Sequence, residues 1–362
     1  MNLIFRKPIV LILGLFLSVG IVITSCSDDD DNPTPVDFTA LEDAIDDATE
    51  RLAATEEGIN DGQFSAAART ALQTAITSAQ EVVDDETSTQ TDVANAVVAL
   101  TQAVETYNAA EIAPVAVEAL VAHWSFDEGT GTVAGDNSEN GFDGTLKTGH
   151  IDWGGGFPAW SEDRHGDDGK ALHFDEGANI EIPYSTALNP SQMSIALWVN
   201  ADEINENNRF LGLHSWVGYK FQLQSTNRPF FTVHNDEDGY YDRDAEVELP
   251  INEWHHIAVT FGGGNTIFYI DGVAVKTWDN TPGEAMSIAD DPYNLVIGQD
   301  FPTDMYSEGD GTGFDDPNSP NYRIIPLAWG GYFRGLLDEV RIYNTVLTAS
   351  QIETVYNREK PE

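Results

Sequence analysis

The 362-residue chain has a single cysteine, Cys26, so no disulfide can form within it. Basic residues are also scarce: 17 Lys and Arg stand against 61 Asp and Glu, and the formal net charge is −44 at pH 7. Such a surface repels nucleic acid and anionic lipid, so we expect neither as a partner. Neutral glycans, cationic groups and divalent metals are compatible with it. The acidity alone indicates solubility and no particular function.

An almost uncharged apolar run from Ile9 to Ile23 follows Arg6 and Lys7. The run is short for a membrane-spanning helix and is followed by small residues, which predicts a secretory signal over residues 1–25. The stretch Ile-Thr-Ser-Cys that ends at Cys26 resembles the bacterial lipobox, whose cysteine receives diacylglycerol and becomes the mature N-terminus. The resemblance implies lipidation and stable membrane anchoring. The alternative is an uncleaved signal anchor with an incidental cysteine.

Residues 26–36 are predicted to form a lipidated acidic tether, because Ser27 is followed by four aspartates and a Pro-containing stretch that cannot bury a core. A similar acidic run after the lipid-bearing cysteine marks lipoproteins of Bacteroidota that are sent to the outer face of the outer membrane. The resemblance therefore implies a position in the outer membrane, facing the cell exterior.

Residues 37–112 carry apolar side chains at helical spacing in three stripes, 38–52, 72–83 and 93–107. Thr89 is a suitable N-cap for the third stripe. Short loops between the stripes predict an antiparallel three-helix bundle. The segments GQF and TQTDVANAVVALTQAV resemble the FIVAR module of bacterial surface proteins. Some such modules bind ligands, but this one is acidic and lacks an aromatic cluster, so we interpret it as a spacer.

After a linker at residues 113–118, residues 119–357 alternate apolar and polar side chains with a period of two, and all eight tryptophans lie in this part. The alternation is clearest at residues 119–126, 193–199, 219–224 and 254–261. Asp271-Gly272 is typical of a hairpin turn. Many short strands predict a two-sheet sandwich or jelly roll. A short helix, capped by Thr348 and Gln351, closes the domain before a tail at residues 358–362.

Five segments of this domain resemble LamG-like domains of the concanavalin A type, in the order found in that family. They are HWSFDEGTGTVAGDNSENGFDGTL, GKALHFDEGANIEIP, MSIALWVNA, EWHHIAVTFGGGNTIFYIDGVAV and GLLDEVRIYNTVLTASQIETVYN. The resemblance implies a mainly β fold, a two-sheet concanavalin A-like jelly-roll sandwich, preceded here by the small three-helix bundle. It identifies no ligand, because this fold hosts many.

The resemblance also implies a structural Ca²⁺, held in that family by an aspartate of the opening loop, main-chain oxygens just after it and the aspartate of a late strand. The matching residues are Asp136, Asn140, Gly141 and Asp338. Hard oxygen ligands suit Ca²⁺, and an unpaired carboxylate in the apolar strand of Asp338 would be costly. The alternative is a surface turn with a hydrogen-bonded aspartate. The loop reads Asp-Asn-Ser-Glu-Asn-Gly where the family commonly reads Asp-Ser-Ser-Gly-Asn-Gly. The sequence therefore does not identify which main-chain carbonyls would coordinate the ion. The acidic residues 308–316 are a weaker candidate for a second cation.

Two long insertions, residues 150–168 and 301–332, are candidates for ligand binding, because long loops at the ends of a sandwich usually carry it. Aromatic rings stack on the C–H faces of sugars while polar neighbours bind the hydroxyls. The candidate residues are Trp153, Trp160, Tyr306, Trp329 and Tyr332. The alternative is that Trp160 and Trp329 only cover the ends of the core.

No catalytic signature is present in the sequence, and we predict no catalytic residue. A retaining glycosidase of this shape needs two carboxylates about 5 Å apart, usually at alternating positions of one strand. No Glu-x-Asp-x-x-Glu or Gly-x-Ser-x-Gly motif occurs. Asp338 and Glu339 are adjacent, so we expect them on opposite faces of their strand.

The sequence therefore predicts a surface lipoprotein whose LamG-like domain binds a polysaccharide or other glycan, for capture or use together with neighbouring glycan-uptake proteins. An adhesion or structural protein that contacts other proteins is the alternative, and a polysaccharide-active enzyme is a third interpretation. The sequence leaves the glycan and the oligomeric state open.

Overall fold

The computed structural model describes residues 35–112, 114–115, 117–237 and 239–361. The predicted secretory signal, the lipidation site Cys26 and the first nine residues of the tether lie outside these ranges.

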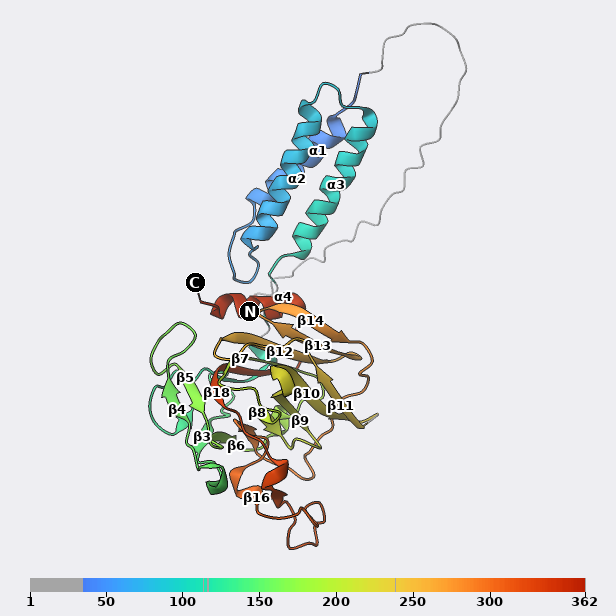
Figure 1. Cartoon of the computed structure of the whole chain (residues 1–362). Coiled ribbons are helices and arrows are strands. Elements are labelled where there is room, and N and C mark those ends of the chain that lie inside the picture. The colour runs from blue at the N-terminus through green and yellow to red at the C-terminus, as the bar shows by residue number, and fades with distance from the viewer. Residues whose placement is uncertain (1–34, 113, 116, 238, 362) are drawn as a thin grey trace, which may run out of the picture.

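Three antiparallel helices form the predicted bundle (Figure 1): α1 (Thr39–Ala53), α2 (Ala66–Asp84) and α3 (Gln90–Ala109). Thr89 caps α3 as predicted, in a capping box with Asp92. The apolar stripes meet in one core, because residues three and four apart share a helix face. The rings of Phe64, just before α2, and of Tyr107, near the end of α3, stack with their centroids 4.2 Å apart.

Two antiparallel sheets pack face to face and confirm the predicted mainly β sandwich. The first sheet contains, in order, β14 (Val273–Trp278), β13 (Asn265–Ile270), β12 (His255–Gly262), β7 (Met193–Ala201), β18 (Gly335–Tyr343), β5 (Ala171–Phe174) and β4 (Ala159–Ser161), with β1 (Leu120–Trp124) also paired to β18. The second contains β11 (Gly239–Asp244), β10 (Arg228–Asn235), β9 (Tyr219–Gln224), β8 (Asn208–Leu213), β15 (Leu295–Ile297), β6 (Asn179–Ile182), β3 (Gly144–Lys147) and β2 (Val133–Ala134).

Aromatic and branched side chains fill the space between the sheets, because the alternation along each strand sends every second side chain inward. Trp124, Phe174, Phe221, Phe231 and Phe261 are among the fully buried members of this core. The two strands β16 (Tyr306–Ser307) and β17 (Ile325–Pro326) form a small parallel pair within the second insertion. Short 3-10 turns complete the domain: η1 (Val117–Ala119), η2 (Ile151–Trp153), η3 (Thr186–Leu188), η4 (Ser225–Asn227), η5 (Thr303–Met305) and η6 (Leu327–Trp329).

Helix α4 (Ala349–Glu359) lies on the outer face of the first sheet, over a small apolar cluster that includes Tyr269 and Ile352. Its capping box of Thr348 and Gln351 is the predicted one. The helix extends two residues beyond the expected domain end at 357. Those two residues belong to the fold, because Arg358 contacts the bundle and Glu359 is buried.

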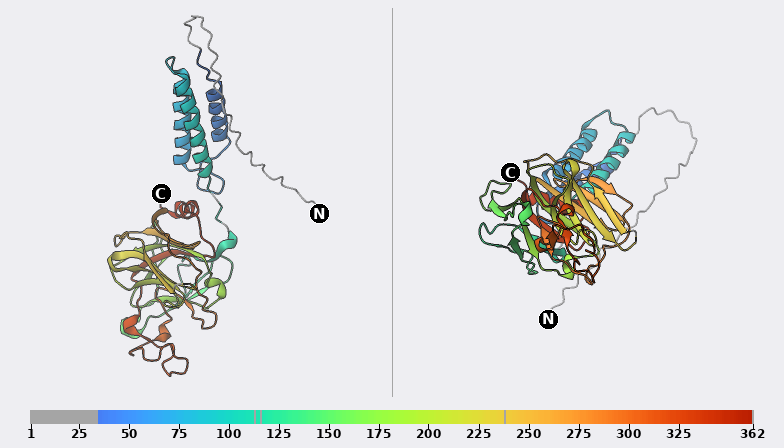
Figure 2. Two further views of the ribbon diagram at one scale, coloured as in Figure 1. Left: turned by 90° about the vertical axis from the view of Figure 1, so that its right-hand side faces the viewer. Right: turned by 60° about the horizontal axis from the view of Figure 1, so that its bottom comes forward.

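The bundle and the second insertion lie at opposite ends of the β-domain, with α4 next to the bundle (Figures 1 and 2). Arg358 donates to the carboxylate of Asp61 at 2.6 Å and to the carbonyl of Ile59 at 3.2 Å. Gln351 donates to the carbonyl of Pro114 at 2.9 Å. Within the described ranges, no helix is both long enough and apolar enough to cross a membrane.

Candidate functional site

The two insertions meet at one end of the sandwich. Trp153 of η2 packs against Tyr306 and Tyr332, with ring centroids 4.6 and 5.2 Å apart. Trp329 of η6 lies in the same insertion as these tyrosines and contacts Trp216 at 5.9 Å between centroids. Four of the five predicted ligand residues therefore come from segments that pack together.

Trp160 does not contact this group through any ring pair. It lies on β4 of the first sheet, where its indole N–H donates to the carbonyl of Gly131 at 3.3 Å. The grouped residues also differ in exposure. Trp329 is 40% exposed, whereas Tyr306 is only 4% exposed and donates its hydroxyl to Asp300. Of these four aromatic side chains, Trp329 offers the largest exposed ring to a ligand.

A buried ion pair holds the second insertion on the sheet. Arg209 of β8 pairs with Asp300, whose side chain is fully buried. Arg209 also donates to the carbonyl of Trp329 at 3.0 Å, and Asp300 accepts from the backbone N–H of Gly331 at 3.4 Å. The turn that carries Trp329 is thereby fixed beside β8.

A polar pocket of about 280 Å³ opens on the outer face of β8 to β11, next to this turn. It is lined by Glu206, Asn207, Arg209, Lys220, Gln222, Gln224, Ser225, Phe230 and Asp242. Gly331 crowds its edge, since a Cβ built there would lie 2.5 Å from the carbonyl oxygen of Asn207. Larger hollows of about 460 and 530 Å³ lie on the helical bundle, but no buried polar side-chain atom in the described bundle lacks a partner.

The pocket floor contains an unsatisfied amide. Gln222 is 2% exposed, and its Nε2 donates to Oε1 of Gln224 at 2.9 Å. Its own Oε1 is buried without a hydrogen-bond partner among the described residues. Buried polar atoms are nearly always paired, so an orphan at the floor of a pocket marks a place where a donor from outside can bind.

Sequence reasoning missed this pocket. Lys220, Gln222 and Gln224 alternate with the core residues of β9, and that alternation predicts a strand and nothing more. A solvent-facing row of polar side chains is normal on any antiparallel sheet. The pocket arises where β8 to β11 and the loop before β8 come together, and the alternation along one strand does not show this.

The residues predicted to hold calcium are already engaged in other contacts. The carboxylate of Asp136 accepts from the backbone N–H groups of His123, Ser138 and Phe142 at 2.9–3.0 Å. The hydrogen bonds lower the pKa of Asp136, although its partial burial acts in the opposite direction. Asn140 donates its side-chain amide to the carbonyls of Leu120 and Val121, both at 3.0 Å, in the loop that Gly141 completes at positive φ.

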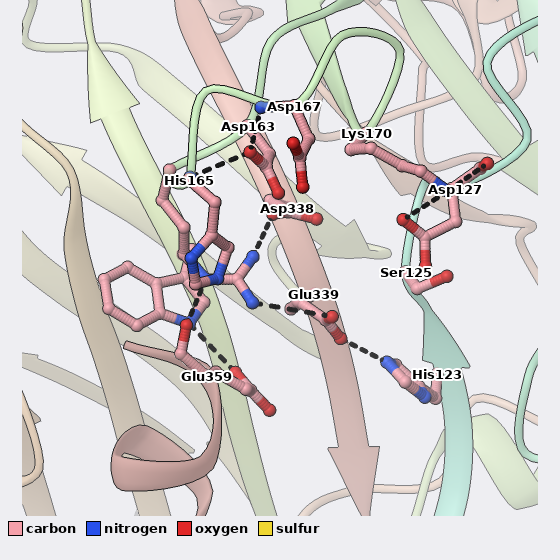
Figure 3. A network of polar contacts seen from close by, with 12 residues as sticks. His123, Ser125, Asp127, Asp163, His165, Asp167, Lys170, Asp338, Glu339 and Glu359 are labelled. Carbon is pink, nitrogen blue, oxygen red and sulfur yellow. Dashed lines mark hydrogen bonds and ion pairs between the residues drawn. The ribbon is translucent and has the colours of Figure 1, made fainter. Parts of the chain in front are cut away.

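Asp338 meets an arginine instead of the Asp136 loop. Arg164 of the first insertion pairs with Asp338 and lies 3.7 Å from Glu339, and its Nε donates to the carbonyl of Glu359 at 2.6 Å. Figure 3 shows Asp338 and Glu339 next to each other on one strand, with His123 beyond Glu339.

The expectation that Asp338 and Glu339 point to opposite faces is wrong. The register of β18 against β7 shifts between Asp338 and Arg341, and Glu339 takes a left-handed φ of 54°. Such a β-bulge interrupts strict alternation, so both carboxylates reach the same guanidinium. On its other edge β18 pairs with β5 up to Leu337 and with β1 from Val340, which leaves the bulge between two partner strands.

Burial has opposite outcomes for the acids of this arginine-centred cluster, depending on the partners of each acid. Burial raises the pKa of Asp338 to about 8, against the opposing effect of Arg164, and raises the pKa of Glu359 to about 7. Burial also opposes ionisation of Glu339, but the hydrogen bond with His123 at 2.6 Å and the charge of Arg341 outweigh it and lower the pKa to about 2. Glu339 is therefore the ionised acid that faces Arg341 and Arg164.

As arranged, these residues do not fit a calcium shell. The Asp136 carboxylate is occupied by N–H donors, and Arg164 pairs with Oδ2 of Asp338. Of these two carboxylates only Oδ1 of Asp338 is left buried and without a partner among the described residues, whereas Ca²⁺ takes about six to eight oxygen ligands. In the described part of the chain, no group of three or more His, Cys, Asp or Glu side chains is placed to hold a metal ion. This geometry does not support the calcium site that the resemblance implies, and the melting experiment below tests it. The residues 308–316 stay a candidate for a second cation.

Comparison with known proteins supports the class of the fold. Residues 174–312 match the family described as the concanavalin A-like lectin/glucanases superfamily. Together with the two antiparallel sheets, this match defines the β-domain as a concanavalin A-like sandwich. A comparison with curated proteins finds no match.

Several solved structures are similar to the chain at low identity. Domain 4 of AbnA, a GH43 extracellular arabinanase from Geobacillus stearothermophilus, in complex with arabinotriose, has 23% identity and a TM-score of 0.47, over 66% of this chain and 98% of that one. The binding domains of Paraclostridial Mosquitocidal Protein 1 and of Botulinum Neurotoxin DC in complex with SialylT have 15% and 11% identity and TM-scores of 0.45. Each covers 67% of this chain and 52% of the other. Likeness at these scores transfers neither a ligand nor a residue role.

Replacing Arg164 with alanine is expected to lower the free energy of unfolding by about 3–5 kcal/mol, because it removes the partner of the buried Asp338 side chain. The exposed pair of Arg228 and Glu248 provides the control, since Arg228→Ala should cost less than about 1 kcal/mol. Urea unfolding of both variants measures the difference. Equal losses would show that Arg164 is no more than a surface charge.

Calcium is tested by melting the wild-type chain with millimolar CaCl₂ and with chelator. The arginine already supplies a positive charge at Asp338, so we expect the same melting temperature in both buffers. Asp136→Ala should likewise melt equally in both. A melting temperature several degrees lower in chelator, abolished by Asp338→Ala, would instead establish the predicted calcium ion.

Proposed function

We propose that the β-domain binds carbohydrate in the polar pocket on β8 to β11. The observation that carries the proposal is the buried, unpartnered Oε1 of Gln222 at the pocket floor. A sugar hydroxyl is a donor of suitable size for this acceptor, and small polar pockets with a few fixed hydrogen-bonding groups recognise sugars in this way.

The neighbouring turn supplies the apolar part of the site. Trp329 is exposed, and its backbone carbonyl accepts from Arg209, a residue of the pocket wall. A ring beside a polar pocket can stack on the C–H face of one sugar unit while the pocket binds the hydroxyls of the next. The match to a superfamily described by lectins and glucanases supports carbohydrate binding in general.

The proposed role is binding without catalysis. The adjacent acids Asp338 and Glu339 lie on the first sheet and are engaged with Arg164, His123 and Arg341, so they are not presented to a substrate. The pocket carboxylates Glu206 and Asp242 are exposed, and Asp242 accepts from the hydroxyl of Thr232 at 2.6 Å.

We further propose that Cys26 is lipidated and holds the chain on the outer membrane, facing the cell exterior, where it serves glycan capture beside uptake proteins. The arrangement of the described parts suits such a role. The helical bundle precedes the β-domain, and the insertion with Trp329 lies at the far end from the bundle (Figures 1 and 2). Ligand from outside would then reach the site without obstruction by the bundle.

Glycan binding is tested with Gln222→Leu and Trp329→Ala on an array of plant, algal and host polysaccharides, followed by titration of the best ligand. Each variant should weaken binding at least tenfold, which corresponds to about 1.4 kcal/mol. Trp160→Ala is the matched control, since this predicted ligand residue lies away from the pocket, and it should keep its affinity. Melting curves verify that each variant is folded. If no glycan on the array binds and a specific protein partner is captured instead, the adhesion alternative is favoured.

The anchor is tested by Cys26→Ala in a bacterial host that lipidates exported proteins. The wild-type chain should sediment with membranes and be digested by protease added to intact cells, whereas the variant should be released from the membrane because a lipid anchor is lost. A variant that still sediments with membranes would support the uncleaved signal anchor.

A further inference from the structure

The pocket contains one cation that no acid neutralises directly. Lys220 lies on β9 between Tyr219 and Phe221, both of which are fully buried in the core, so its side chain points outward into the pocket. In the described part of the chain Lys220 is half-buried and has no ion pair or hydrogen bond, while most of the arginines there are paired. Burial lowers its pKa, Arg209 adds to this, and Asp300 and Asp242 oppose it.

The second cation of the floor is already engaged. Arg209 is 8% exposed and pairs with the fully buried Asp300, so these two charges offset each other. Its remaining contacts are the Trp329 carbonyl at 3.0 Å and Oδ1 of Asn207 at 3.2 Å. The charge left over at the floor is the ammonium of Lys220.

The acids that share the pocket lie at its rim. Glu206 and Asp242 are exposed, where water and salt screen their charges. Lys220 is partly withdrawn from solvent, where an ion pair with a ligand is screened less. A ligand anion at the pocket floor would therefore be attracted by Lys220 more strongly than it is repelled by the carboxylates of Glu206 and Asp242 at the rim.

We propose that this pocket selects sugars that carry an anionic group, the carboxylate of a uronic acid or a sulfate ester, with Lys220 as the cation that binds that group and Gln222 as the acceptor of a neighbouring hydroxyl. The proposal rests on the proposed function, because it specifies the ligand of the same pocket. An ammonium is a compact point charge and suits either anion.

The charge of the whole chain makes the proposal specific. At a net charge of −44 the surface repels polyanions, so binding of an acidic glycan cannot come from general attraction. It requires a local cationic site. Such binding, if it depends on Lys220, identifies the pocket directly.

The test titrates the purified full-length chain in detergent with four ligands: a trigalacturonate, its methyl ester, a sulfated galactan oligosaccharide and its desulfated form. Wild type should bind at least one acidic ligand tenfold or more tightly than its neutral counterpart. Lys220→Met should abolish that preference, so that the acidic and neutral forms bind with equal affinity, while Lys220→Arg should retain it. Lys147→Met is the control, an exposed lysine on β3 of the same sheet, and should behave as wild type.

The outcomes separate the two proposals. Preference for the carboxylate or for the sulfate alone supports the inference and identifies the anion. Equal binding of charged and neutral forms, unchanged by Lys220→Met, overturns the anionic ligand and leaves glycan binding intact. Absence of binding to all four ligands and to every neutral glycan of the wider array overturns both. Melting curves of the Lys220 variants exclude loss of fold as the cause.

Discussion

The buried ion pair of Arg209 and Asp300 is the interaction on which the proposed site depends. Two charges taken out of water stay ionised only if their geometry and remaining hydrogen bonds compensate for the lost hydration. Here Tyr306, the backbone of Gly331 and the carbonyl of Trp329 complete the set. Those partners all belong to the second insertion, so satisfying the pair fixes a long loop against β8. The pair also fixes Arg209, a residue of the pocket wall, and holds the turn of the exposed Trp329 beside it.

A second arginine has a similar role on the opposite sheet. Arg164 joins the first insertion to the bulge of β18 and to the end of α4, and it stacks over Trp198 with its guanidinium carbon 5.1 Å from the ring centroid. The chain has 17 Lys and Arg against 61 Asp and Glu. Two of its arginines, Arg164 and Arg209, hold long loops against the sheets. Arginine suits these junctions because its planar group satisfies several acceptors at once and stays charged when buried.

The bulge in β18 shows how local backbone geometry changes a chemical conclusion. With strict alternation, Asp338 and Glu339 would lie on opposite faces and only one would meet Arg164. The left-handed φ of Glu339 brings both to the same cation. The cluster therefore differs from the calcium site expected by resemblance, because the positive charge beside Asp338 is that of Arg164. It also explains why two neighbouring acids in a jelly roll need not be a catalytic pair.

The sequence by itself determined the three helices, the strands, their turns and caps, and the sandwich class, because these follow from hydrophobic period and local turn chemistry. Thr89 and the Asp271-Gly272 turn are positions where local signals sufficed. It also singled out Trp153, Tyr306, Trp329 and Tyr332, which the fold brings into packed segments, and Trp160, which it does not. Only the tertiary structure decided the rest: the partners of Asp338, the bulge at Glu339, and the pocket around Gln222 and Lys220. The partners of Asp338 and Arg209 lie about 90 to 175 positions away in the sequence, and no periodicity along the chain encodes which distant side chain arrives at a given face.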